Sequence, residues 1–233
     1  MGVARYKRAV QKCDARGDKR MKFTTIVIAA CAIFSVVGSA AAQDRMPRIP
    51  DDKLTDAQKK AVAQVSAARG GNMPAPFNPV MRDPEFLSAL EKLGTHLRYL
   101  TAPSESPLGQ KLNELVIVME ARRWTQQTEF QSHYAAALKY GMKAEALEAI
   151  NEGRRPVGMP EDEQIVYDFC TELHQNQSVS DATYAQAVKK FGEKGVVDMV
   201  GLTGYYVMIS MLTSVARTAP PQVIQYPLVH FPH

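Results

Sequence analysis

Glu129 and His133 are the two residues whose types and spacing point most directly to chemistry in this sequence of 233 residues. They stand four positions apart in a segment with helical periodicity, so their side chains lie on one helix face, about one turn apart. A carboxylate at that distance can hold one imidazole nitrogen, fix the tautomer of the ring and raise its basicity. The other nitrogen then stays available to a substrate. The same spacing is also typical of an ordinary surface pair.

A second carboxylate, Glu114, lies in the preceding segment, inside an apolar run over residues 112–119. A carboxylate in such a run is seldom buried without a partner. The short turn near Trp124 predicts that the two helices pack antiparallel. We therefore expect Glu114 to approach the helix face that carries Glu129 and His133.

Helical periodicity continues through the chain after Ile49, and no segment shows the sustained alternation of a β-strand. The proline-rich stretch 72–82 is predicted as a loop, and glycine or proline residues punctuate the other segments. These patterns predict an all-α fold. Helices are expected over residues 55–69, 84–100, 108–123, 125–140, 144–152, 161–175, 181–191 and 195–217.

The segment 195–217 is long and apolar enough to resemble a membrane span. Asp198, three glycines and the Tyr205-Tyr206 pair favour instead a buried helix or a subunit contact. Long apolar helices in a chain of this size also indicate buried contacts between subunits. We therefore expect a homo-oligomer.

The first 42 residues differ in charge from the rest of the chain. They carry eight of the 28 Lys and Arg residues and two of the 24 Asp and Glu residues, which leaves 20 basic and 22 acidic side chains in the body. Nucleic-acid binding depends on the neutralisation of phosphates by basic side chains. A mildly acidic body therefore argues against a nucleic-acid partner.

From Met21 the sequence has the layout of an export signal. An apolar run over residues 23–37 leads to a small triplet that ends at Ala42, which predicts signal-peptide cleavage near Ala42 and a periplasmic or secreted protein. Residues 1–20 precede this signal as a basic extension. An uncleaved membrane anchor and lipid attachment at Cys31 are the alternatives.

The spacing of the candidate groups resembles that of the carboxymuconolactone decarboxylase and AhpD-like superfamily. The thiol branch of this superfamily carries Glu, eleven residues, Cys-x-x-Cys, three residues and then His. Here Glu114 is followed after eleven residues by Gln126-x-x-Glu129, and after three more by His133. Glu129-Phe130-x-x-His133 is also similar to the Glu-Trp-x-x-His motif of exported and catabolic non-thiol relatives. Further similarities lie at residues 179–184 and 204–206.

The resemblance covers roughly residues 75–219 and implies an AhpD-like helical bundle that assembles as a trimer or a hexamer. Residues 43–74 are then an N-terminal helix and linker, and residues 220–233 an extended, proline-punctuated tail. Because both cysteines of the thiol motif are absent, the thiolate nucleophile and resolving thiol of a dithiol peroxidase are missing. We expect no peroxiredoxin-type activity. Cys170, alone after the leader, is expected to be a small buried apolar residue.

The resemblance further implies acid/base chemistry of a carboxy-lyase kind, either decarboxylation or lactone conversion, on a small carboxylated compound. We expect His133 to transfer the proton, Glu129 to orient its ring and Glu114 to act as a second carboxyl in the network. An arginine near the end of the first helix can anchor a substrate carboxylate, and aromatic rings can wall the pocket. A solvated helix end and ordinary helix packing are the alternatives for these residues. The residues expected to bind substrate are Arg122, Arg123, Trp124, Gln126 and Tyr206.

Two other functions are compatible with the sequence. The first is a non-catalytic exported module that binds a small molecule or a partner, because aromatic-acid catabolism in this superfamily is normally cytoplasmic. The second is a metal site at the Glu114, Glu129 and His133 constellation, which has suitable ligand types but one histidine. His96 and His174 are further candidate ligands. We expect no metal and no other cofactor.

Overall fold

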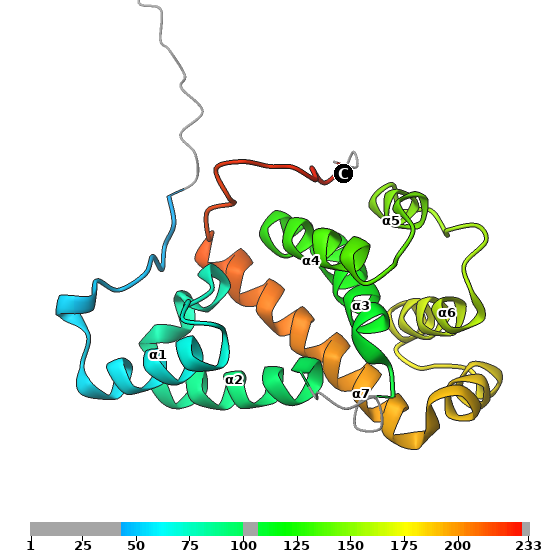
Figure 1. The fold of residues 1–233 in the computed structure, drawn as a ribbon, viewed down its shortest axis with the longest axis horizontal. Coiled ribbons are helices and arrows are strands. Elements are labelled where there is room, and N and C mark those ends of the chain that lie inside the picture. The colour runs from blue at the N-terminus through cyan, green and yellow to red at the C-terminus, as the bar shows by residue number, and fades with distance from the viewer. Residues whose placement is uncertain (1–42, 100–106, 230–233) are drawn as a thin grey trace, which may run out of the picture. The chain divides into compact units, whose positions relative to one another are not determined.

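The computed structural model describes residues 43–99 and 107–229. Within these ranges the chain forms α-helices and short 3-10 helices and no strand, so the predicted all-α fold is confirmed (Figure 1). The predicted signal peptide lies outside the described residues. In chain order the elements are η1 Asp51–Lys53, α1 Asp56–Ala68, η2 Ala75–Phe77, η3 Pro79–Arg82, α2 Pro84–Tyr99, α3 Gly109–Arg123, α4 Gln127–Lys139, α5 Ala144–Asn151, α6 Glu161–Asn176 and α7 Asp181–Ala216.

Side-chain caps fix where several helices begin. Thr55 and Gln58 form a reciprocal capping box at the start of α1, in which each side chain accepts the other residue's backbone N–H. Asp83 accepts a first-turn N–H of α2 at 2.9 Å, and Pro84 takes the first helical position, where no N–H is needed. Ser180 caps α7 in the same way.

One segment differs from the sequence expectation. The stretch 72–82 is expected as a loop, but the structure forms the short helices η2 and η3 there, because a proline sits in the first turn of each. The last two predicted helices both form, as the two parts of α7. Gly192, with φ 70° and ψ 172°, is the non-helical residue between the two parts, a conformation that suits glycine.

α3 is the central helix of the described fold. It packs against α4, α5, α6 and α7, while α1 pairs with α2 and α2 also contacts α7. Ten of its fifteen residues are buried, which explains why the helix has no clear polar face. Its buried carboxylates, Glu114 and Glu120, therefore need partners on neighbouring helices.

Among the described residues α7 is the one helix that is long and apolar enough to cross a membrane, judged by length and composition alone. In the structure it packs against α2, α3 and α6, and 44% of its most apolar window is buried. Several of its apolar side chains nevertheless remain exposed, among them Val197, Val200, Met211 and Val215.

Candidate functional site

The turn between α3 and α4 sets the geometry of the site. Thr125 has a left-handed backbone with φ 52°, and the N–H of Gln126 returns to the carbonyl of Ala121 at 2.8 Å, which closes α3. α4 then folds back along α3. This reversal brings Glu114, from the early part of α3, beside His133 in the middle of α4.

Both nitrogens of His133 face carboxylates. Nδ1 lies 2.5 Å from Oε2 of Glu114, and Nε2 lies 3.3 Å from Oε2 of Glu129. All three residues are buried, with exposed fractions of 6%, 2% and 5% in the same order. The closer contact belongs to Glu114, so this residue holds the ring, whereas the sequence spacing favours Glu129 for that task. Glu129 instead lies beside Nε2, the ring nitrogen on the side of the cavity.

The surroundings of His133 favour the charged imidazolium. Burial by itself lowers the pKa of the ring, but the hydrogen bonds to Glu114 and Glu129 outweigh burial and raise the pKa above its ordinary value. The positive charge of Arg98 opposes this effect. In its protonated form the ring carries an N–H at Nε2, on the side of Glu129 and Tyr206, and this proton can be donated.

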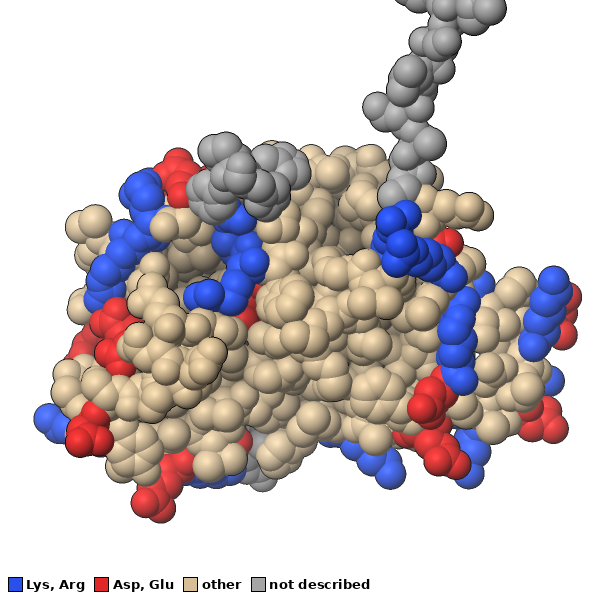
Figure 2. All heavy atoms as spheres, turned by 180° about the vertical axis from the view of Figure 1, so that it is seen from behind, with Lys and Arg blue, Asp and Glu red and all other residues tan. Residues whose placement is uncertain are grey.

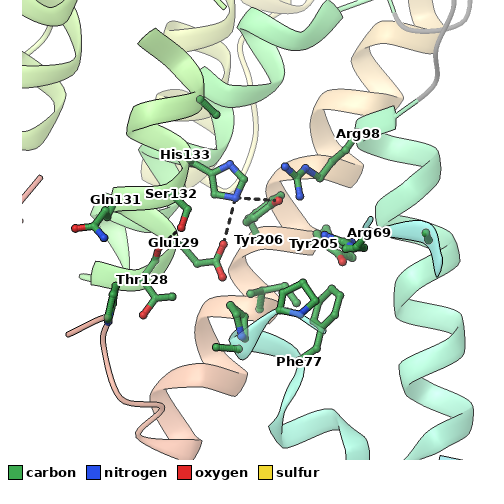
Figure 3. Close-up of a pocket in the computed structure, with 17 residues that line it drawn as sticks. Arg69, Phe77, Arg98, Thr128, Glu129, Gln131, Ser132, His133, Tyr205 and Tyr206 are labelled. Carbon is green, nitrogen blue, oxygen red and sulfur yellow. Dashed lines mark hydrogen bonds and ion pairs between the residues drawn. The ribbon is translucent and has the colours of Figure 1, made fainter. Parts of the chain in front are cut away.

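Tyr206 of α7 completes the environment of His133. Its hydroxyl lies 3.4 Å from Nε2, and the two rings meet edge to face with centroids 5.2 Å apart (Figure 3). Burial raises the pKa of Tyr206 well above the ordinary value. The phenol therefore stays neutral and can donate a hydrogen bond to a developing oxyanion.

Two arginines that the sequence does not single out lie at the same site. Nη2 of Arg98 is 3.6 Å from Oε1 of Glu114, and its guanidinium stands 5.7 Å from the ring centre of Tyr206. Arg69 pairs with Glu91 at 2.8 Å. Each arginine lies near the C-terminal end of a predicted helix, and no sequence spacing connects either of them to α4. Only the packing of α1 and α2 on the rest of the fold reveals them.

These groups surround a cavity of about 750 Å³. His133 and Glu129 line it from α4, Tyr205 and Tyr206 from α7, and both arginines from the opposite wall (Figure 3). Glu114 lies behind the ring of His133 and does not line the cavity. The cavity is large enough for a small organic molecule. Its remaining lining residues are Ala68, Pro74, Ala75, Pro76, Phe77, Thr128, Gln131, Ser132, Ala136, Ile209 and Pro221.

Arg122 and Arg123, expected at the substrate, lie elsewhere. They line a second cavity of about 440 Å³ together with Arg154. On the face seen in Figure 2, Lys and Arg side chains gather around a hollow. Arg122 and Arg123 follow Glu114 by eight and nine positions, about two and a quarter and two and a half helical turns, so their side chains leave α3 in other directions. Nε of Arg122 donates to the carbonyl of Asn151 at the end of α5, at 2.6 Å.

Gln126 and Trp124 also stay outside the lining of the larger cavity. The amide nitrogen of Gln126 donates to the hydroxyl of Ser214 at 2.5 Å, which ties the start of α4 to α7. Trp124 is half-buried in the turn after α3. Of the residues expected to bind substrate, Tyr206 is the one that shares a cavity with His133.

The other candidate metal ligands are separated from the site. His174 bonds to Glu120 at 2.8 Å, and His96 is exposed on α2. In the described ranges no group of three or more His, Cys, Asp or Glu side chains has an arrangement suited to a metal ion. Cys170 is buried, and burial raises the pKa of its thiol to about 12, so it is not an activated nucleophile.

Comparison with known proteins adds a likeness of fold. No protein-family model matches the chain, and no curated protein matches it either. A solved structure described as an uncharacterized peroxidase-related protein from Silicibacter sp. TM1040 is similar, with a TM-score of 0.61 and 15% sequence identity over 82% of this chain and 98% of that one. At this identity the likeness concerns the fold alone.

Proposed function

We propose that this protein catalyses acid/base chemistry on a small carboxylated compound, as a non-thiol relative of the carboxymuconolactone decarboxylases. The observation that carries the proposal is a buried histidine, held at Nδ1 by Glu114, whose Nε2 faces a cavity beside Glu129 and Tyr206. A fixed imidazole with a raised pKa, at the edge of a cavity, is suited to proton transfer. The substrate would be a carboxylate or a lactone.

In a decarboxylation, the bond between the substrate carbon and its carboxylate breaks and carbon dioxide leaves. The electron pair moves onto a neighbouring carbonyl as an enolate, and the hydroxyl of Tyr206 donates a hydrogen bond to that oxyanion. The proton on Nε2 of His133 is then transferred to the carbon, and the ring recovers a proton from water. Glu114 keeps Nδ1 protonated and the ring in place throughout.

Arg98 takes the anchoring role that the sequence suggests for Arg122 or Arg123. Its guanidinium lines the cavity beside Tyr206 and can bind a substrate carboxylate through two parallel hydrogen bonds. Glu114 connects this arginine to His133, so substrate binding and proton transfer share one carboxylate.

The proposal is tested by measuring turnover of carboxymuconolactone and related lactones by the wild type and by His133→Ala and Tyr206→Phe variants. We expect no detectable turnover by His133→Ala, and a decrease of about 10²-fold for Tyr206→Phe because an oxyanion donor is lost. Tyr184→Phe, at an exposed position on α7, is the matched control. Equal turnover by the wild type and His133→Ala would exclude His133 from the mechanism.

A second candidate function is a binding module without catalysis. The observation that favours it is the position of Glu129, whose carboxylate already occupies the cavity-facing nitrogen at 3.3 Å. A thermal-shift screen of carboxylates and lactones, followed by assays of each ligand found, separates the two functions. Ligands that bind to this cavity and are never converted would favour the module.

Export and assembly belong to the same proposal. Export is supported by the sequence of residues 1–42. Mass spectrometry of the protein recovered from a secreting host tests it, and the expected result is a new N-terminus at Gln43.

A homo-oligomer, a trimer or hexamer by resemblance, is supported by the exposed apolar side chains of α7. Light scattering on the purified protein measures the number of subunits, and a monomer at all concentrations would contradict the proposed homo-oligomer.

A further inference from the structure

The last described residues of the chain lie extended across α4 and reach the end of α5 (Figure 1). α7 ends at Ala216. The C-cap residue Arg217 has a left-handed backbone with φ 55°, and two exposed or half-exposed prolines at 220–221 prevent the helix from continuing. Residues 222–229 then form neither helix nor strand. We call residues 222–229 the strap.

Three side-chain amides hold the main chain of the strap, and each makes two hydrogen bonds. Each amide nitrogen donates to a strap carbonyl, and each amide oxygen accepts from the N–H two residues further on. The six distances lie between 2.6 and 3.1 Å. The carbonyl and N–H partners are Val223 and Gln225 for Gln131, Tyr226 and Leu228 for Gln127, and Pro227 and Val229 for Asn151.

This arrangement recognises peptide backbone. A carboxamide carries one donor group and one acceptor, which match the carbonyl and N–H groups of an extended chain whatever its side chains. When an extended peptide is bound in this way, main-chain hydrogen bonds supply affinity and side-chain pockets supply specificity. Three such amides in a row, on α4 and at the end of α5, make a site for a peptide of about this length.

Two side chains of the strap supply the specificity. The ring of Tyr226 stacks on that of Tyr134, with centroids 4.3 Å apart and 21° between the planes. Leu228 belongs to the hydrophobic core and is 5% exposed. Val223 and Ile224, in contrast, are 78% and 45% exposed. The contacts thus favour peptides with the pattern Tyr-x-Leu, and they place little restriction on the side chains before it.

We propose that Gln127, Gln131, Tyr134 and Asn151 form a peptide-binding groove, and that the strap of a second copy of this chain can occupy it in place of the copy's own strap. A second copy carries an identical strap, so all six backbone bonds and both side-chain anchors are available to it. The residues that link α7 to the strap are exposed or half-buried, so they are the hinge about which the strap would exchange between copies. The groove is separate from the cavity beside His133, except that one groove residue, Gln131, also lines that cavity. Pro221, just before the strap, lines the cavity as well.

The experiment measures binding of a fluorescent peptide with the sequence of residues 222–233, by fluorescence anisotropy. In the wild type the strap in place competes at high effective concentration and weakens peptide binding. A full-length variant with Tyr226→Ala and Leu228→Ala keeps the groove but loosens its own strap. We expect this variant to bind the peptide at least about tenfold more tightly than the wild type.

Two further variants show where the peptide binds. Adding Gln127→Ala and Gln131→Ala to the loosened variant should abolish the gain, while adding Gln175→Ala, at an exposed position on α6, should preserve it. A peptide with Tyr226 and Leu228 replaced by alanine should bind at least about tenfold more weakly. No gain in the loosened variant, or an equal gain without the two groove glutamines, would overturn the proposal.

Hydrogen exchange on the wild type keeps the proposal testable if the loosened variant fails to fold. The N–H groups of Gln225 and Leu228 are bonded to the groove amides. An exchangeable strap must open without unfolding of the domain, so these amides should exchange much faster than those inside α4. Equal exchange rates for the strap and for α4 would show that the strap opens only by global unfolding and would overturn the inference.

Discussion

Nδ1 of His133 and Oε2 of Glu114 lie 2.5 Å apart, although nineteen positions separate the two residues in the sequence. The other oxygen of the same carboxylate faces Arg98 at 3.6 Å. One buried carboxylate therefore joins the candidate acid/base residue to the candidate anchor for substrate. Loss of its charge should affect both.

Glu114→Gln should lower the pKa of His133 and slow turnover by about 10²-fold, because the amide keeps the shape of the carboxylate but removes its charge. Nuclear magnetic resonance titration of the His133 ring and steady-state kinetics measure the two effects. Glu148→Gln, which changes the partner of Tyr134 and leaves the ring contacts of His133 intact, is the control. An unchanged His133 titration in Glu114→Gln would exclude this role for Glu114.

The pH dependence of stability should carry the signature of His133. Its pKa in the folded protein is raised above the unfolded value of about 6.5. Protonation therefore stabilises the fold: the contribution is fully present below about pH 6.5 and is lost as the pH rises through the folded-state pKa. Each unit of pKa difference corresponds to about 1.4 kcal/mol. Urea unfolding of the wild type and His133→Gln between pH 6 and pH 9 should show a difference that shrinks with pH, and a constant or growing difference would contradict this.

Arg98→Gln should raise KM for a carboxylated substrate by about 10- to 100-fold, because a charge-assisted hydrogen bond to the substrate is lost. Arg123→Gln should leave KM unchanged, since that side chain lines the other cavity. Steady-state kinetics of the two variants thus compare the anchor that the structure favours with one that the sequence favours. A larger effect of Arg123→Gln than of Arg98→Gln would reverse the assignment.

Gly94→Ala should destabilise the fold by about 1–3 kcal/mol. A Cβ at this position would lie 2.4 Å from the hydroxyl oxygen and 2.8 Å from Cζ of Tyr205, a ring that is itself buried. Gly204→Ala on α7 is the matched variant, because a Cβ there meets nothing within 4 Å. It should stabilise its helix by up to about 1 kcal/mol. Urea unfolding measures both, and equal effects of the two substitutions would refute the packing argument.

The sequence by itself determined the elements of this protein. Capping residues such as Thr55 and Ser180, prolines and apolar periodicity are local signals, and they place the helices close to their observed positions. The i,i+4 spacing of Glu129 and His133 follows directly from helix geometry, and the missing cysteine pair is visible without any structure. The kink at Gly192, between the two predicted final helices, is a local feature of the same kind.

The tertiary structure decided which groups meet. Contacts between helices depend on how each helix is rotated and where it crosses its neighbour, and no local pattern encodes these two quantities. The short turn after α3 predicts that Glu114 approaches His133, but the sequence favoured Glu129 as the residue that orients the ring and did not reveal Arg98. The packing of the helices decides both points. The strap is held on α4 and α5 by amides about 80 to 100 positions away in the chain, and only the folded arrangement brings them together.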